Sequence, residues 1–272
     1  MIVNADDFGL TPGVTAGILE AHAAGTVTAA SMLVRGPGWE DGVQRALATP
    51  SLDIGLHFNL LLGAPLTAAR SLRAPGGEFQ SLGALGWRAL TGRLDEGEVI
   101  AECEAQLAAL AQAGIRVTHL DSHRHTHAFP VIRRAVARVA AERGLVLRRP
   151  VESPRWSPAD LKSQLHRAAV AAAWAATSPG VRATRSPDHF AGISLQGAAG
   201  PRAFAARIAA LVHGLPPGTT ELMVHPGRAD PALAAVDGYT TPREHELAVL
   251  ADAGLRDRIG GEGIALVGFG AL

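Results

Sequence analysis

The sequence predicts a single α/β domain built as a (β/α) barrel of seven or eight parallel strands. Short apolar runs alternate with segments of helical length along the whole chain, which is the pattern of βα units and a parallel sheet. Six or seven such units can be traced, and 272 residues are enough for one barrel of about 250 residues. No linker or internal repeat divides the chain, so we treat 1–272 as one domain.

The first half of the chain supplies four expected strands, interleaved with segments of helical length. Thr11 is a suitable N-cap for the first helix, and Gly25 follows where that helix should stop. Gly114 ends the helix before the fourth strand in the same way. The expected strands are 1–3, 29–33, 53–58 and 115–120, and the expected helices are 12–24, 39–47 and 96–112.

The second half keeps the alternation but contains more loop. Its expected strands are 145–147, 220–224 and 264–269, and its expected helices are 131–143, 160–175, 201–212 and 242–253. The segment 61–95 is interrupted by Gly and Pro, so we expect a long loop insertion after the third strand. This insertion forms either a surface excursion or a wall of a substrate site, since loops at strand carboxyl ends carry the sites of barrels.

Composition narrows the class of protein. Lys plus Arg and Asp plus Glu number 25 each, without a basic stripe, so we expect no nucleic-acid partner. The longest apolar run, 168–176, is too short to span a membrane. The single cysteine, Cys103, excludes an internal disulfide framework. The first residues lack the pattern of an export signal, so we expect a cytoplasmic protein; a homodimer is expected on base rates alone.

Titratable side chains recur where the expected strands end. Asp6 and Asp7 close the first strand, His57 lies in the third, 119–127 follows the fourth, and His225 follows strand 220–224. In a parallel barrel these ends face one rim, so distant segments converge there. Adjacent buried carboxylates repel each other, and imidazoles with a carboxylate make a good site for Zn, Co, Ni or Fe. The sequence therefore predicts a metal site.

The alternation of His123, His125 and His127 strengthens this prediction. Residues two apart share one side of an extended segment, and residues four apart share one side of a helical turn. His123 and His127 can therefore face the same side in either conformation. Three nearby polar residues are candidates for orienting the ligating imidazoles: Asp121, Ser122 and Asn59.

Five motifs of this chain together resemble those of the YdjC family of carbohydrate deacetylases. They are Asn4–Gly9, Gly55–Leu60, Thr118–His127, Asp188–Gly192 and Glu221–Gly227. Arg243 with Glu246-Leu247 also resembles the late helix of the family, so the resemblance extends over essentially the whole chain. It implies a distorted TIM-like barrel and removal of the acetyl group from an N-acetylated sugar such as a chitooligosaccharide.

The resemblance also implies one divalent metal ion, held by Asp7, His57 and His123. Two imidazoles and one carboxylate favour Zn or Co by affinity, the family makes Mg equally acceptable, and Mn is a further candidate. Arg124 and the insertion depart from the family pattern. The resemblance therefore implies the chemistry but neither the sugar nor the chain length.

For the reaction, we interpret Asp6 as the general base that takes a proton from the attacking water. Its alternative role is to orient a neighbouring ligand. We interpret His225 as the general acid that protonates the leaving amine, since imidazole titrates near neutral pH. The alternative for His225 is a structural histidine before a Pro-Gly turn.

Other residues are candidates for substrate contact. His125 and His127 could be further ligands, sugar contacts or structural residues, whereas His119 is interpreted as structural. One side chain of the pair Arg148 and Arg149 could face the rim and bind the sugar. The aromatic candidates for stacking on a sugar ring are Trp87, Trp156 and Phe190.

Two other functions fit the same residues. A metal rim could hydrolyse a different amide or an ester, although phosphoesters usually need a second metal or a basic phosphate clamp. A non-catalytic, metal-containing sugar-binding protein is the alternative outside enzymes. Asp6 and His225 favour an enzyme, because a binding protein needs neither an acid nor a base. Acetate release from N-acetylated sugars discriminates among the three.

Overall fold

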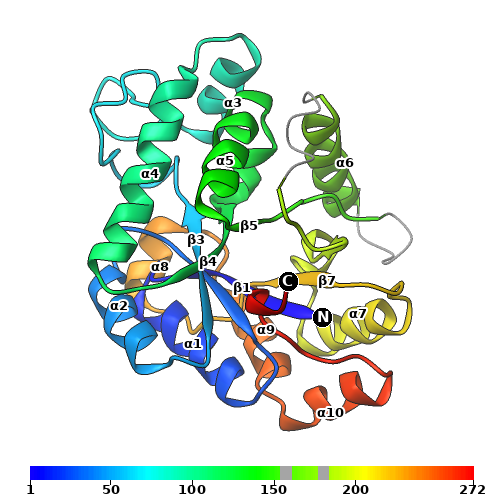
Figure 1. Cartoon of the computed structure of the whole chain (residues 1–272). Coiled ribbons are helices and arrows are strands. Elements are labelled where there is room, and N and C mark those ends of the chain that lie inside the picture. The colour runs from blue at the N-terminus through cyan, green and yellow to red at the C-terminus, as the bar shows by residue number, and fades with distance from the viewer. Residues whose placement is uncertain (154–160, 177–183) are drawn as a thin grey trace.

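The computed structural model describes residues 1–153, 161–176 and 184–272 (Figure 1). Its centre is one parallel sheet of seven strands in the order β5-β4-β3-β2-β1-β7-β6. Each strand pairs with its neighbours in parallel register. The strands are β1 Ile2–Phe8, β2 Ala29–Met32, β3 Asp53–Phe58, β4 Val117–Ser122, β5 Val146–Leu147, β6 His189–Ala191 and β7 Thr220–Val224.

Helices surround the sheet (Figure 1). They are α1 Pro12–Ala23, α2 Trp39–Ala48, α3 Leu82–Leu90, α4 Glu96–Gln112, α5 Pro130–Arg143, α6 Leu161–Ala175, α7 Pro201–His213, α8 Pro231–Val236, α9 Thr241–Leu250 and α10 Ala253–Gly261. Three 3₁₀ turns complete the described elements: η1 His123–Ala128, η4 Ile193–Leu195 and η5 Phe269–Ala271. The predicted N-cap of α1 is confirmed, because the Thr11 side chain accepts a hydrogen bond from the Val14 amide.

The sheet curls until its two edges come near each other. The Leu147 amide donates to the Arg185 carbonyl at 2.8 Å, and an isolated parallel bridge joins Glu152 to Phe190 in β6. These contacts connect the chain around β5 with the chain around β6. The prediction of a distorted TIM-like barrel is confirmed, with seven strands.

The interior strand β1 determines where the functional residues lie. All seven of its residues are buried, and it pairs with β2 on one edge and β7 on the other. Its carboxyl end, which carries Asp6 and Asp7, therefore lies inside the sheet rather than at an edge. The carboxyl ends of β3, β4 and β7 surround it.

One predicted strand is absent from the structure, and one observed strand was not predicted. The expected strand 264–269 is wrong: Val267 donates one hydrogen bond to the Met1 carbonyl, and the terminal ammonium bonds the Ala265 carbonyl. Because β1 already pairs with β2 on one edge and β7 on the other, it has no free edge with which 264–269 could pair. The strand β6 went unpredicted because three residues carry too little pattern.

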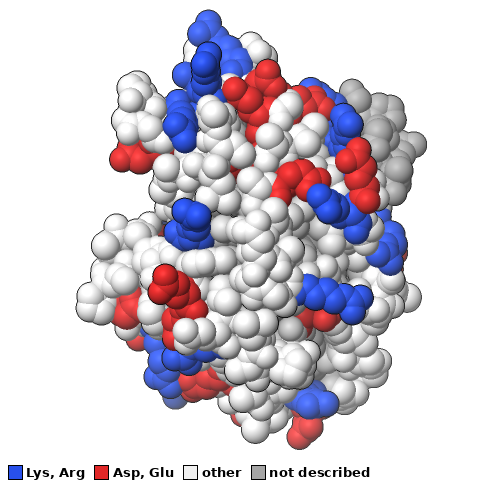
Figure 2. Space-filling model, turned by 60° about the vertical axis from the view of Figure 1, so that its left-hand side comes forward, with Lys and Arg blue, Asp and Glu red and all other residues white. Residues whose placement is uncertain are grey.

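The segment after β3 is not loop throughout, because it includes helix α3. The buried Glu102 of α4 anchors its first part by accepting hydrogen bonds from the amides of Leu66 and Thr67, each at 3.0 Å. Within the described ranges, no helix combines the length and hydropathy needed to cross a bilayer. Figure 2 shows basic and acidic side chains intermixed over one face, which matches the zero formal net charge.

The barrel interior contains a neutral histidine that makes stability sensitive to acid. His119 is fully buried, stacks on Phe269 with ring centroids 3.8 Å apart, and lies 3.1 Å from the Ser31 hydroxyl. A Cβ atom on Gly55 would lie 2.3 Å from its ring, so glycine makes room for the imidazole. Burial lowers the pKa of His119 from 6.5 to about 3. The folded protein therefore loses stability as the pH falls below 6.5, because only the unfolded chain takes up this proton readily.

We predict that His119→Gln flattens this dependence. One proton contributes about 1.4 kcal/mol per pH unit to the free energy of unfolding. Between pH 6.0 and 5.0, the wild type should lose about that much more stability than the variant. Urea unfolding in the presence of a chelator measures it, with the exposed His213→Gln of α7 as control. Equal slopes for wild type and His119→Gln would contradict the assignment.

Candidate active site

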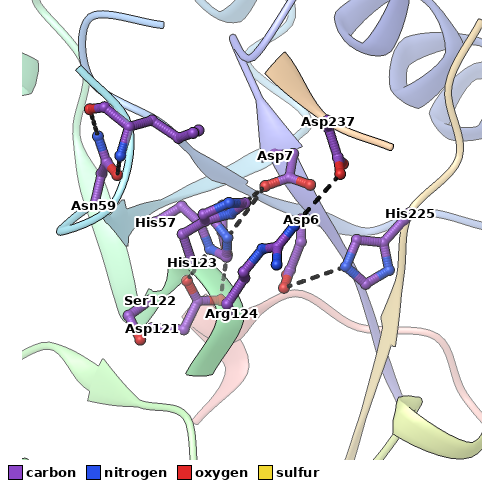
Figure 3. Close-up of polar contacts among 12 residues, drawn as sticks. Asp6, Asp7, His57, Asn59, Asp121, Ser122, His123, Arg124, His225 and Asp237 are labelled. Carbon is purple, nitrogen blue, oxygen red and sulfur yellow. Dashed lines mark hydrogen bonds and ion pairs between the residues drawn. The ribbon is translucent and has the colours of Figure 1, made fainter. Parts of the chain in front are cut away.

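A pocket of about 290 Å³ lies at the carboxyl end of the central strands. Asp6 and Asp7 come from β1, His57 from β3, and His225 from the residue after β7. Figure 3 shows these side chains pointing toward one another. The other lining residues are Leu82, His123, Arg124, His125, Lys162, His166, Gln196, Met223, Asp237, Tyr239 and Arg243.

Asp7, His57 and His123 form the tightest cluster in the pocket. The Oδ1 atom of Asp7 lies 3.3 Å from Nε2 of His57 and 3.0 Å from Nδ1 of His123. The three candidate ligand atoms lie within 4.8 Å of one another. All three side chains are buried. One carboxylate and two imidazoles in this arrangement fit a divalent cation.

A left-handed turn places Asp6 and Asp7 in the same pocket. Neighbouring residues of a regular strand point to opposite faces. Asp7, however, has φ of +71°, a conformation that non-glycine residues seldom adopt. Gly9 follows with φ of +79°, and the Leu10 amide donates to the Asp7 carbonyl at 3.0 Å. The strand therefore ends in a turn that redirects the second carboxylate.

A buried arginine compensates the acidic groups behind this cluster. Arg148 donates two hydrogen bonds to Asp6, at 2.7 and 2.6 Å. It also lies 2.8 Å from Asp121 and 2.7 Å from Glu221. A second geometric candidate for a metal site, formed by Asp6, His57 and Asp121, is thus already neutralised by a guanidinium. The cation is better placed at Asp7.

Asp121 orients His57 toward Asp7. Its Oδ1 lies 2.6 Å from Nδ1 of His57, which leaves Nε2 directed at Asp7. Its other oxygen accepts hydrogen bonds from Ser31 at 2.6 Å and Asn4 at 3.3 Å. Burial alone would lower the pKa of His57, but the carboxylates of Asp121 and Asp6 raise it to about 10. The pocket thus favours a positive charge at this imidazole, which a bound cation would supply in place of the proton.

The outer oxygen of Asp7 has a different partner. Oδ2 accepts a hydrogen bond at 2.5 Å from Arg243 of α9, which also binds Asp237 at 2.7 Å. Despite burial, the charges of Arg243 and His123 hold the pKa of Asp7 well below its usual range. Asp7 is therefore a charged carboxylate with one oxygen facing the two imidazoles.

His225 lies on the far side of Asp6. Its Nε2 is 3.9 Å from Oδ2 of Asp6, and this contact is drawn in Figure 3. The backbone amide of His225 donates to Glu246 at 2.6 Å, and Tyr239 donates to the other oxygen of Glu246 at 2.7 Å. Glu246 thereby fixes the loop that carries the imidazole. The ring remains partly exposed to the pocket.

The three histidines after β4 separate into different environments. His123 faces Asp7. His125 also lines the pocket, and its buried Nδ1 has no hydrogen-bond partner among the described residues. His127 lies instead between the Ser122 hydroxyl at 2.5 Å and the Arg148 carbonyl at 3.2 Å. The expected pairing of His123 with His127 is absent because Arg124 and His125 both have left-handed backbone angles.

Several other sequence candidates lie away from the pocket. Asn59 forms hydrogen bonds with the backbone of Leu61 and Leu62, so the idea that it orients an imidazole is wrong. Ser122 orients His127 rather than a residue of the Asp7 cluster. Arg149 lines a separate hollow, since it is the neighbouring Arg148 that points inward.

Two of the three aromatic candidates, Trp87 and Phe190, lie away from the pocket. Trp87 is half exposed on α3 and lies under the Arg93 guanidinium. Phe190 is buried beneath Arg148, with the guanidinium carbon 5.5 Å from its ring centroid. Trp156 lies outside the described residues.

Four residues of the site had no role in the sequence interpretation: Glu221, Asp237, Tyr239 and Arg243. Tyr239 is the single tyrosine of the chain, which is a weak signal at best. Glu221 and Arg243 entered only as parts of motifs. Their importance follows from pairing across distant segments, as in the contact of Arg243 with Asp7, 236 positions apart.

Known proteins are similar to this chain in sequence and in architecture. The chain is 34% identical over 273 residues to a carbohydrate deacetylase of Brevibacillus brevis, covering 100% of this chain and 99% of the relative. A solved structure from Enterococcus faecalis, of a protein named for cellobiose-phosphate cleavage, matches with a TM-score of 0.79 and 25% identity. That match covers 99% of this chain and 97% of the other.

A lactam utilization protein of Thermus thermophilus is similar in fold alone, with a TM-score of 0.50 and 17% identity over 98% of this chain and 99% of its own. The family model described as YdjC-like protein matches residues 1–260. The resemblance inferred from the motifs is thereby confirmed, and the chain belongs to the YdjC-like family.

Proposed function

We propose that this protein is a metal-dependent hydrolase that removes the acetyl group from an N-acetylated sugar. The observation that carries the proposal is the meeting of Asp7, His57 and His123 with Asp6 and His225 in one pocket. The name of the Brevibacillus relative supports deacetylation of a carbohydrate. The name of the Enterococcus protein also points to a sugar, in that case a phosphorylated one.

Oδ1 of Asp7, Nε2 of His57 and Nδ1 of His123 would hold the divalent ion, with Zn, Mg, Co and Mn as candidates. When bound, the ion supplies a Lewis acid that polarises the acetamide carbonyl and lowers the pKa of a water molecule. Asp121 keeps the ring of His57 oriented. Such carboxylate–imidazole pairs fix both the tautomer and the direction of a ligand.

Asp6 is proposed as the general base. It takes a proton from the water that attacks the acetyl carbon. The two hydrogen bonds from Arg148 fix the plane of its carboxylate, and each oxygen retains a further lone pair. Asp6 also lines the pocket, next to Asp7 in the chain. Its position therefore suits proton transfer at the edge of the metal cluster.

His225 is proposed as the general acid. When the carbon–nitrogen bond breaks, the nitrogen of the sugar must gain a proton, and an imidazolium near neutral pH can give one. His225 reaches the pocket from the side opposite the Asp7 cluster, with Asp6 between. The reaction then releases acetate and a free amino sugar.

The outer part of the pocket is proposed to bind the sugar. The ring of His125 lines the pocket, and burial lowers its pKa, so the ring is neutral there. Arg124 and Lys162 also line the pocket. These two cationic side chains favour an acetylated sugar that carries an anionic group. A cytoplasmic location and a homodimer stay predictions of the sequence.

Acetate release tests the proposal directly. Metal-free protein is supplied with Zn, Mg, Co or Mn in turn and offered N-acetylated mono- and disaccharides, each with and without a 6-phosphate. We expect metal-dependent release of acetate that a chelator abolishes. Release from acetyl esters alone would favour an esterase. Sugar binding without release under every metal would favour a binding protein.

We predict that Asp6→Asn keeps stoichiometric metal but lowers kcat by about 100-fold or more, because a general base contributes about 10²- to 10⁴-fold. Asp7→Ala provides the contrast, since it should remove the metal itself. Metal content by atomic absorption and kcat from acetate release are measured side by side. Normal turnover of Asp6→Asn would exclude the base role, and unchanged metal in Asp7→Ala would exclude the ligand role.

We predict that His225→Ala lowers kcat by about 100-fold, because the leaving amine no longer receives a proton from a general acid. Metal content should be unchanged. The variant should lose much less activity on an aryl acetate, whose leaving group needs no proton, than on an acetamide. Equal losses on both substrates would argue for a structural role.

A further inference from the structure

The carboxylate of Asp7 is divided between two kinds of partner. Oδ1 faces Nε2 of His57 and Nδ1 of His123, at 3.3 and 3.0 Å. Oδ2 faces away from them and accepts a hydrogen bond from Arg243 at 2.5 Å. A cation at the cluster therefore meets one oxygen of Asp7 that faces the imidazoles and one that already accepts a hydrogen bond from Arg243.

Arg243 is held firmly in this position. Its side chain is 1% exposed. Nε donates to the Tyr239 carbonyl at 2.8 Å, and the nitrogen that binds Asp7 also binds Asp237 at 2.7 Å. A Cβ atom on Gly227 would lie 3.3 Å from Cδ of Arg243, so the neighbouring loop packs closely against the stem. Release of Oδ2 would require Arg243 to leave a site in which three groups hold it.

The geometry has a consequence for coordination. A carboxylate with both oxygens free can bind a cation in bidentate fashion and fill two positions. A hydrolytic site must keep positions open for water and substrate. The guanidinium also places a positive charge beside the site, which weakens cation binding. The positive charge of Arg243 therefore does not serve to strengthen cation binding.

We infer that Arg243 is a positioning residue that restricts Asp7 to a single bond with the metal and so keeps coordination positions open. The inference rests on the proposed metal-dependent function. It differs from the role of Asp121, which supports a ligand by accepting a hydrogen bond from it. Arg243 instead withholds an oxygen from the metal.

The test is metal binding by Arg243→Gln, without substrate. Calorimetry with Zn²⁺ on metal-free protein should show a dissociation constant at least about threefold lower than in the wild type, because a nearby positive charge is lost and Oδ2 becomes available. The visible absorption of bound Co²⁺ should weaken as the coordination number rises. Activity should fall about 10-fold or more, although metal is bound more tightly.

Two comparisons make the result decisive. Arg258→Gln removes an exposed arginine of α10 from its ion pair with Asp252 and should leave both the Zn²⁺ affinity and the Co²⁺ spectrum unchanged. A crystal structure of the zinc-loaded wild type should show Asp7 bound through Oδ1 only, with Arg243 still on Oδ2. That second measurement needs no variant and holds even where Arg243→Gln does not fold.

Bidentate binding of Asp7 in the wild type would overturn the inference. Weaker or unchanged Zn²⁺ binding by folded Arg243→Gln would overturn it as well. Because these readouts need no substrate, they are separate from the proposed reaction. A protein that binds Zn²⁺ as described but releases no acetate would refute the deacetylase and leave the role of Arg243 standing.

Discussion

The burial of several carboxylates at the carboxyl end of one sheet is the constraint on which this structure depends. Asp6, Asp7, Asp121 and Glu221 are all nearly or fully buried, and charges without partners are costly there. Arg148 forms ion pairs with three of them, and Arg243 forms an ion pair with the fourth, Asp7. The two arginines do not fully compensate the negative charge. Burial and the nearby carboxylates of Asp121 and Asp6 raise the pKa of Glu221 to about 7, even with Arg148 beside it. A divalent ion at Asp7 would relieve the remaining excess of negative charge.

This charge balance was only partly predictable. Asp6, Asp7, His57, His123 and His225 stood out because each is a titratable residue at the end of an apolar run. Parallel strands bring such ends to one rim, so their convergence followed from the alternation of strands and helices. The arginines that balance the carboxylates could not be predicted from this alternation. Arg148 and Arg149 are equivalent in the sequence, and only the direction of the chain after β5 decides which one is buried.

Local backbone geometry also limited how much of the site could be predicted from the sequence. The alternation of a regular strand would place Asp6 and Asp7 on opposite faces, yet the left-handed angle at Asp7 brings both into one pocket. The same effect at Arg124 and His125 separates His123 from His127. Neither turn is marked by a glycine at the residue concerned, which is the usual signal. The strand predicted at 264–269 failed for a different reason, since it depended on a free sheet edge that β1 does not have.

The division of labour between Asp6 and Asp7 follows from their partners rather than from their chemistry. Both are aspartates, both are buried, and both bind an arginine. Arg148 contacts both oxygens of Asp6, so each of them accepts a hydrogen bond from one guanidinium. Arg243 contacts one oxygen of Asp7 and leaves the other for the metal. The nearest imidazole to Asp6 on the opposite side is His225, at 3.9 Å. Two identical side chains thereby acquire different proposed functions, one in proton transfer and one in metal binding, because two different arginines hold them.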